Sequence, residues 1–195
     1  MGGGLKGQIY GSQALMGELG TQLAATGTRK TLGKSEAFSM SRLKLCIINN
    51  SGRRPRYNRA RLQRVLELAV KEAHLDQVTL TILLVGDKES ALLHDQHFNE
   101  PTTTDVMTFP DGSENPATKV VHLGDLAVCV DVARRLAELR GRPVGEELTL
   151  YCLHGLLHLL GFDDTTAKKL TKMWATQVRL LACEGITIES TPTAL

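Results

Sequence analysis

The amino-acid sequence predicts an α/β (α+β) protein, a single domain in which a small mixed sheet of about four strands is packed by about five helices. Three observations carry this prediction. The chain has 195 residues, a length that suits one domain with a sizeable core. Short apolar, β-branched stretches alternate with longer stretches of helical periodicity. Finally, every apolar run is shorter than the roughly 18 residues that a membrane-spanning helix needs.

The composition is that of a soluble globular protein, with 42% hydrophobic and 23% charged residues. The formal net charge of +2 permits an anionic partner but does not indicate one, because basic charge must be clustered to matter. The four cysteines are isolated from one another in the sequence. We therefore expect them to be reduced and mostly buried, in a compartment like the cytosol.

The first half of the expected domain alternates strands and helices. Residues 43–49 (LKLCIIN) form a strand, and residues 58–75 form a helix with one apolar stripe made of Leu62, Val65, Leu66, Ala69 and Val70. Residues 78–86 (VTLTILLVG) alternate between apolar and polar side chains at their start and are rich in β-branched residues, which predicts a second strand. Residues 87–99 begin with an aspartate suited to capping and predict a short helix.

The second half adds two strands and then three helices. Residues 104–110 are a strand closed by Pro110, residues 111–119 a turn-rich loop, and residues 120–130 a strand interrupted by Gly124. The helices are expected at 131–141, 145–161 and 166–185, with Met173 and Trp174 in the core.

The two ends are expected to lie outside the domain, which spans residues 41–185. Residues 1–40 are rich in Gly, Thr and Ser without a sustained period, which indicates a disordered extension or a misassigned start, with Met40 as the true first residue. Organelle targeting is the lesser alternative. Residues 186–195 are expected to fray.

The stretch HGLLHLLGFDD (154–164) carries the chemistry. His154 and His158 are four residues apart, so on a helix both side chains can reach a single ion. Gly161 can end that helix in a left-handed conformation, after which the chain folds back and delivers Asp164 to the same point. Two imidazoles and a carboxylate are good zinc ligands, and a fourth position left open is typical of catalytic sites.

Less specific interpretations stay open for the same residues. The two histidines could be core or surface residues of an ordinary apolar helix. Asp163 could instead be the N-cap of the following helix, and Asp164 could share that role.

The spacing is also that of the metzincin peptidases, H-E-x-x-H-x-x-G-x-x-H. However, Gly155 stands where a peptidase has the glutamate that takes a proton from the attacking water, and Asp164 stands at the third histidine. These differences argue against a metallopeptidase.

HGLLHLLGFDD resembles the H-G-x-L-H-L-x-G-[YF]-D-H motif of the YbeY family, the endoribonucleases of ribosomal RNA maturation. Two further stretches are similar to family motifs. TDVMTFP (104–110) resembles T-[DN]-V-L-S-F-P, and LGDLAVCVDVARRLAE (123–138) resembles the G-D-I-x-I-[SC] strand with its following helix. The resemblance covers residues 43 to 185 in the right order.

The resemblance implies a single-domain, metal-dependent hydrolase of the bacterial cytoplasm. It implies a single-strand-specific endoribonuclease acting in ribosomal RNA processing and ribosome quality control. Ribosomal RNA and proteins of the small ribosomal subunit would be its partners, without membrane contact or readout of a DNA sequence. It also implies one Zn²⁺ ion held by the motif, here by His154, His158 and Asp164.

Two departures from the family pattern bear on the activity. The third ligand is Asp164 in place of a histidine, which can shift the preference toward harder ions such as Mn²⁺ or Mg²⁺. Phe98 or Asn99 occupies the place of an arginine that would clamp a phosphate.

Several other residues have both a functional and a structural interpretation. The cluster RRPRYNRARLQR (53–64) holds six arginines around one tyrosine, which suits either phosphate contacts or a solvated helix start. Asp105 and Asp125 lie in the family-like motifs and are candidate catalytic residues, either orienting a ligand histidine or assisting proton transfer. The solvent-exposed interpretation is preferred for His94, His97, Lys168, Lys169 and Lys172, and a structural one for His122.

The leading hypothesis is thus a metal-dependent endoribonuclease acting on ribosomal RNA. The alternative is a ribosome-assembly factor with a structural metal and weak or no catalysis, which the missing arginine and Asp164 favour. A metallopeptidase is third. The sequence leaves the oligomeric state open.

Overall fold

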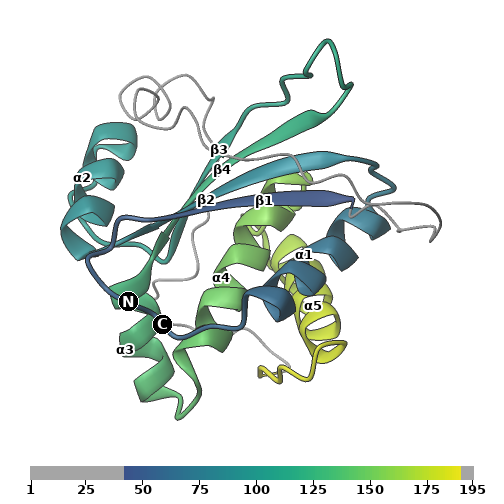
Figure 1. Ribbon diagram of the computed structural model, residues 1–195. Coiled ribbons are helices and arrows are strands. Elements are labelled where there is room, and N and C mark those ends of the chain that lie inside the picture. The colour runs from purple at the N-terminus through teal and green to yellow at the C-terminus, as the bar shows by residue number, and fades with distance from the viewer. Residues whose placement is uncertain (1–41, 190–195) are drawn as a thin grey trace, which may run out of the picture.

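The computed structural model describes residues 42–189, so the expectation for residues 1–40 lies outside the described residues (Figure 1). The elements follow in the order β1 (Leu43–Asn49), α1 (Arg59–Glu72), β2 (Val78–Val85), α2 (Asp87–Phe98), β3 (Val106–Pro110), β4 (Val121–Cys129), α3 (Val130–Leu139), α4 (Val144–Leu159) and α5 (Ala167–Ala182). Each coincides with a stretch that the sequence predicts, with small shifts at the ends. The predicted α/β class is confirmed.

The described strands form one mixed sheet in the order β1-β2-β4-β3. β1, β2 and β4 are parallel, and β3 runs antiparallel to β4. Helices α1, α4 and α5 lie together on one face of this sheet, and α2 lies at one of its ends (Figure 1). The parallel strands need helical crossovers, which explains why strands and helices alternate along the first half of the chain.

Helix α4 is the centre of the core. It packs against β3 and β4 on one side and against α1, α3 and α5 on others. Every residue from Glu147 to His158 is buried, so this helix has no solvent-facing stripe. The apolar stripe of α1 is buried as predicted, and Met173 and Trp174 of α5 are buried with it. Of the four cysteines, Cys129 and Cys152 are buried, whereas Cys46 and Cys183 are exposed.

The segment after α5 corrects one expectation. Ile186 and Ile188 are 0% and 6% exposed and belong to the main core, and the Trp174 indole nitrogen donates a hydrogen bond to the Glu189 carbonyl. Arg142 also pairs with Glu189. Residues 186–189 are therefore packed and not frayed, because two isoleucines find an apolar surface there. Residues 190–195 lie outside the described residues.

A bulge in β4 decides which side chains share a face. Thr79 pairs with His122 and Thr81 pairs with Asp125, so β4 has one residue more than β2 between these two pairs. Gly124 takes up this residue with a φ of +141°, opposite Pro110 of β3. His122 and Asp125 consequently point to the same face, where they are in contact.

The described helices include none long and apolar enough to cross a membrane.

Replacing Gly124 by alanine should lower the free energy of unfolding by about 3 kcal/mol or more. A Cβ atom there would lie 2.2 Å from the Phe109 carbonyl oxygen, and the backbone conformation is one that only glycine adopts readily. Gly112 is the matched control, because its φ is also positive at +78° but nothing lies within 4 Å of an added Cβ. Gly112→Ala should cost only about 1 kcal/mol. Urea unfolding followed by fluorescence of the buried Trp174 measures both; equal losses would contradict this account of the bulge.

Candidate metal centre

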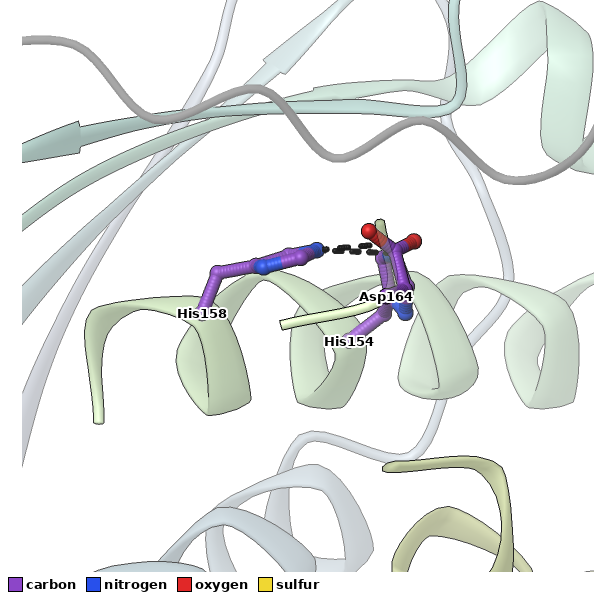
Figure 2. A group of neighbouring side chains, drawn as sticks. All are labelled: His154, His158 and Asp164. Atoms are coloured by element: carbon purple, nitrogen blue, oxygen red, sulfur yellow. Dashed lines mark hydrogen bonds and ion pairs between the residues drawn. The ribbon is translucent and has the colours of Figure 1, made fainter. Parts of the chain in front are cut away.

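Helix α4 presents two imidazole rings from one face, as the four-residue spacing predicts. The His154 and His158 side chains are each 1% exposed, and their Nε2 atoms are 3.2 Å apart. Figure 2 shows both rings standing on the same side of the helix with their tips turned toward each other. Two imidazoles buried this deeply need defined partners for their polar atoms.

The end of α4 supplies one of these partners. Gly161 has a φ of +87°, and the pair of backbone hydrogen bonds from Gly161 to His158 and from Phe162 to Leu157 makes a Schellman turn. This turn reverses the chain and brings the Phe162 carbonyl oxygen to 3.2 Å from His158 Nδ1. The His158 Nδ1–H therefore donates to a backbone oxygen, which leaves the lone pair of the neutral ring on Nε2.

Two residues beyond this turn, Asp164 reaches the same point in space. Its Oδ2 atom lies 3.8 Å from His154 Nε2 and 3.9 Å from His158 Nε2, and its side chain is only 7% exposed. Figure 2 shows the carboxylate above the two rings. One ligand atom from each residue lies within 4.8 Å of the others, so the three side chains could hold a metal ion. The convergence expected from the sequence is present.

The neighbouring Asp163 does something different. Its carboxylate accepts hydrogen bonds from the backbone and hydroxyl of Thr165 and from the Lys169 ammonium. The Lys169 ammonium, with Thr165, holds the pKa of Asp163 well below its usual range. The N-cap of α5 is Thr166, whose hydroxyl accepts from the Lys169 backbone. Neither aspartate caps α5, which corrects the capping interpretation and leaves Asp164 available to the histidines.

Gln177 of α5 completes the support of the rings. Its Oε1 atom lies 3.0 Å from His154 Nδ1, so this nitrogen donates and the lone pair of His154 is on Nε2. Gln177 is 1% exposed and lies on the apolar face of α5 with Met173 and Leu180. The motif around the histidines does not point to Gln177, although a lone polar residue in an apolar stripe is a signal that could have identified it.

The result is a cluster of three hydrogen-bond acceptor atoms that face one another, and no described residue donates a hydrogen bond into the cluster. Both Nε2 atoms carry lone pairs, and Asp164 Oδ2 is buried without a hydrogen-bond partner in the described part of the chain. Burial, reinforced by His158, lowers the pKa of His154 well below its usual range, so this imidazole is neutral at pH 7. Neutral imidazoles and a carboxylate are the forms that bind metals.

The geometry fits a divalent cation. The nearest point equidistant from three atoms with these separations lies in their plane, about 2.1 Å from each, close to the roughly 2.0–2.2 Å of zinc–nitrogen and zinc–oxygen bonds. The nitrogen–oxygen donor set suits zinc and also manganese. The buried Oδ2 of Asp164, which has no hydrogen-bond partner within residues 42–189, is the observation that such an ion would account for.

Gly155 explains why α4 can lie so close to the sheet. A Cβ atom at this position would be 2.8 Å from Leu126 Cδ2 and 3.0 Å from Val106 Cγ2. A side chain here would point into β3 and β4, so the position that carries the peptidase glutamate has no room for one. This packing adds to the argument against a metallopeptidase.

The two candidate catalytic aspartates lie in different places. Asp105 immediately precedes β3, is buried, and is close enough to His158 for the imidazole to affect its pKa. Burial raises the pKa of Asp105; Thr104 donates to its Oδ1, while Oδ2 has no hydrogen-bond partner among the described residues. Asp125 points to the opposite face of the sheet from Leu126, which packs against α4, and it pairs with His122 at 3.0 Å. The structure thus brings Asp105 toward the histidines and does not bring Asp125 there.

The residues before β3 also correct an expectation. His94 is buried and not surface-exposed, and its Nδ1 lies 2.9 Å from the Thr102 carbonyl oxygen. Phe98 ends α2 and packs against the rings of His94 and His97. Phe98, one of the two residues at the place where the resemblance implies an arginine, thus lies in an aromatic cluster. On α5, Lys169 pairs with Asp163, and the Lys172 ammonium lies 5.5 Å above the Phe162 ring.

Comparison with known proteins identifies relatives over most of this domain. A family model described as endoribonuclease YbeY matches residues 47–183. A protein of Thermobifida fusca, named endoribonuclease YbeY, is 38% identical over 128 residues, which are 63% of this chain and 81% of that protein. One of Thermus thermophilus with the same name is 35% identical over 136 residues, 70% of this chain and 97% of that protein. A solution structure from Thermotoga maritima is 20% identical, with a TM-score of 0.44, and covers 71% of this chain and 90% of its own.

We expect metal binding to depend on Asp164 and not on Asp163. Asp164→Asn removes the buried carboxylate that faces both Nε2 atoms and should weaken zinc binding more than 100-fold, because even partners outside the ligand set commonly change affinity about 10–100-fold. Asp163→Asn is the matched control, since it removes one negative charge from the adjacent, half-exposed residue and should leave zinc affinity within about twofold. Competition with a chromogenic chelator measures both. Equal losses would show that general negative charge, and not ligation, holds the ion.

Gln177 should matter through the orientation of the His154 ring. Gln177→Leu removes the acceptor for the Nδ1–H and should weaken zinc binding about 10–100-fold. Gln177→Glu keeps an acceptor at the same place and should retain affinity within about tenfold. The same chelator competition, with thermal unfolding as a check on folding, tests the pair. Undiminished affinity in Gln177→Leu would mean that the ring needs no such support.

Proposed function

The chain belongs to the endoribonuclease YbeY family, and on that premise we propose that it is a metal-dependent endoribonuclease that cleaves single-stranded RNA. The observation that carries the proposal is the convergence of two imidazoles and a carboxylate on one point. We assign His154, His158 and Asp164 as ligands of one divalent cation, with zinc as the first choice and Mn²⁺ or Mg²⁺ as alternatives because of Asp164.

The residues around the site would prepare it for hydrolysis of a phosphodiester. A divalent cation held there supplies Lewis acidity at neutral pH. Gln177 and the Phe162 carbonyl fix the tautomer of each imidazole, so both Nε2 lone pairs face the same point. Asp105 is buried, its Oδ2 is unpaired among the described residues, and its raised pKa suits a group that holds or moves a proton. We assign no role in the reaction to Asp125, because it lies on the other face of the sheet.

We further propose ribosomal RNA as the substrate, with roles in maturation and ribosome quality control. The setting would be the cytoplasm, with small-subunit ribosomal proteins as neighbours. Three facts support this choice. The family is named for endoribonucleases, and the relatives compared above are bacterial. The three sequence motifs that resemble the family also lie together in the fold, with β3 and β4 packed on α4.

A second candidate is a ribosome-assembly factor in which the metal is structural. One observation favours it: Phe98 lies in an aromatic cluster where an arginine could have clamped a phosphate. Such a factor would keep the metal but cleave RNA weakly or not at all.

Replacing His158 by alanine should lower the rate of RNA cleavage at least about 1,000-fold. The reason is that a bound metal supplies several kcal/mol of transition-state stabilisation, and each 1.4 kcal/mol is a factor of ten. His74→Asn is the control, because His74 is exposed at the end of α1 and its left-handed φ of 55° suits asparagine. Cleavage of a labelled single-stranded ribosomal RNA fragment, with and without chelator, measures the effect.

The cleavage assay tests the ligand assignment, and a rescue experiment in cells separates the two candidate functions. Metal-dependent cleavage that survives in His158→Ala would reject the ligand assignment. Rescue of a ribosomal RNA processing defect in cells by a cleavage-dead His154→Ala variant would instead identify an assembly factor.

A further inference from the structure

A cavity of about 620 Å³ lies at the other end of α4 from the metal centre. Its walls come from the segment before α1 and the beginning of that helix, and from the start of α4. The lining residues include Arg56, Tyr57, Arg61, Gly145 and Glu146. Figure 1 shows the chain between β1 and α1 crossing α4 near its first turn. The volume is within the range of roughly 300–1,000 Å³ that is usual for ligand sites.

The walls of this cavity are fixed by close backbone contact. A Cβ atom on Gly145 would lie 2.8 Å from the Arg56 carbonyl oxygen and 2.9 Å from Tyr57 Cα. Only glycine therefore lets the first turn of α4 approach the segment before α1 so closely. Pro55 and Pro143 also line the cavity and restrict the backbone further. A preformed cavity loses little conformational entropy when a ligand binds.

The arginine cluster of residues 53–64 divides into two groups. Arg53 pairs with Asp131, and Arg64 forms a bidentate pair with Glu184. Arg61 has a long ion pair of 3.5 Å with Glu146. For Arg54, Arg56 and Arg59, the structure of residues 42–189 shows no carboxylate partner. The cluster thus carries more positive charge than the described chain neutralises.

The basic groups and one aromatic ring meet at the cavity. Arg56, Tyr57 and Arg61 all line it, and Glu146 is the one carboxylate among the described lining residues. Guanidinium groups recognise phosphate through paired N–H donors. A half-buried aromatic ring offers a face on which a nucleobase can stack, and this combination is typical of single-stranded nucleic acid sites.

We propose that this cavity is a second RNA-binding site, in which Arg56 and Arg61 hold a backbone phosphate of single-stranded RNA and Tyr57 stacks on a base. The inference rests on the proposed function, because it takes the substrate of the metal centre as the ligand. It differs from the metal site in position and in chemistry, since it binds the strand and takes no part in bond cleavage. An acidic protein segment is the competing occupant, but it would not use the aromatic face.

The test compares two arginines of the same segment. Affinity of the full chain for a fluorescein-labelled single-stranded RNA is measured by anisotropy in the presence of chelator, so that cleavage does not interfere. Arg56→Ala should weaken binding roughly tenfold. The slope of log affinity against log salt should become shallower by about 0.7, the value for one lost phosphate contact on a single strand. Arg54→Ala, which removes an equal charge outside the cavity, should weaken binding less than twofold.

A second pair of variants tests the stacking contact. Tyr57→Leu should weaken RNA binding roughly tenfold, whereas Tyr57→Phe should stay within twofold of the unchanged chain. Thermal unfolding of each variant checks that it is folded. The arginine pair provides the answer if Tyr57→Leu does not fold.

The outcomes distinguish this inference from the proposed function. Equal weakening by Arg56→Ala and Arg54→Ala would show diffuse electrostatic attraction and overturn the second site. Unchanged RNA affinity in Arg56→Ala, with weakened binding of polyglutamate, would assign the cavity to an acidic protein and also overturn it. Either result can coexist with metal-dependent cleavage by the unchanged chain. If the unchanged chain showed no metal-dependent cleavage of RNA, the proposed function would be rejected instead.

Discussion

Three electron-pair donors that face one another inside the protein are the constraint on which the rest of the site depends. Two imidazole Nε2 atoms 3.2 Å apart and a buried carboxylate oxygen repel one another unless a cation lies between them. Everything that surrounds α4 holds this arrangement in place. Gln177 and the Phe162 carbonyl take up the two Nδ1–H groups, and the turn at Gly161 returns the carboxylate to the rings.

The same constraint explains how two adjacent aspartates come to differ. Asp163 is bound by Thr165 and Lys169, so its charge is already compensated at the surface. Asp164 has no such partner among the described residues, and its charge is available to an ion. A set with one carboxylate leaves a divalent ion with less net positive charge than a set with three neutral imidazoles. This lowers the attraction for a phosphate at the metal, and more of the binding energy must come from elsewhere.

The sequence predicts the parts of the site that depend on local spacing. The four-residue interval of His154 and His158 and the glycine at 161 are local features, and both rings converge as expected. The same spacing selected Asp164 as the third ligand, whereas the different role of Asp163 could not be predicted locally, because it depends on the Lys169 ammonium reaching its carboxylate. Gln177 is 23 residues from His154, and the Phe162 contact uses a backbone atom, so spacing could not predict either. Burial of Ile186 and Ile188 was missed for a similar reason, since it depends on the tertiary surface that receives them.

Helix α4 links the two regions to which functions are assigned. It spans 16 residues, or roughly 24 Å, with the basic cavity at its first turn and the metal ligands in its last turns. Its burial from Glu147 to His158 makes it a rigid spacer, because a rotation or shift would disturb the packing around it. Phe98 and Asn99 stand where the resemblance to the family leads us to expect an arginine that would hold a phosphate. An RNA strand bound at the proposed cavity would be held at a fixed distance from the metal centre. The binding energy at the cavity would then help to position the strand for cleavage, provided that α4 does not bend. The tight packing at Gly145 and at Gly155 therefore serves the same end: it fixes α4 against the arginine segment at one end and against the sheet beside the metal ligands at the other.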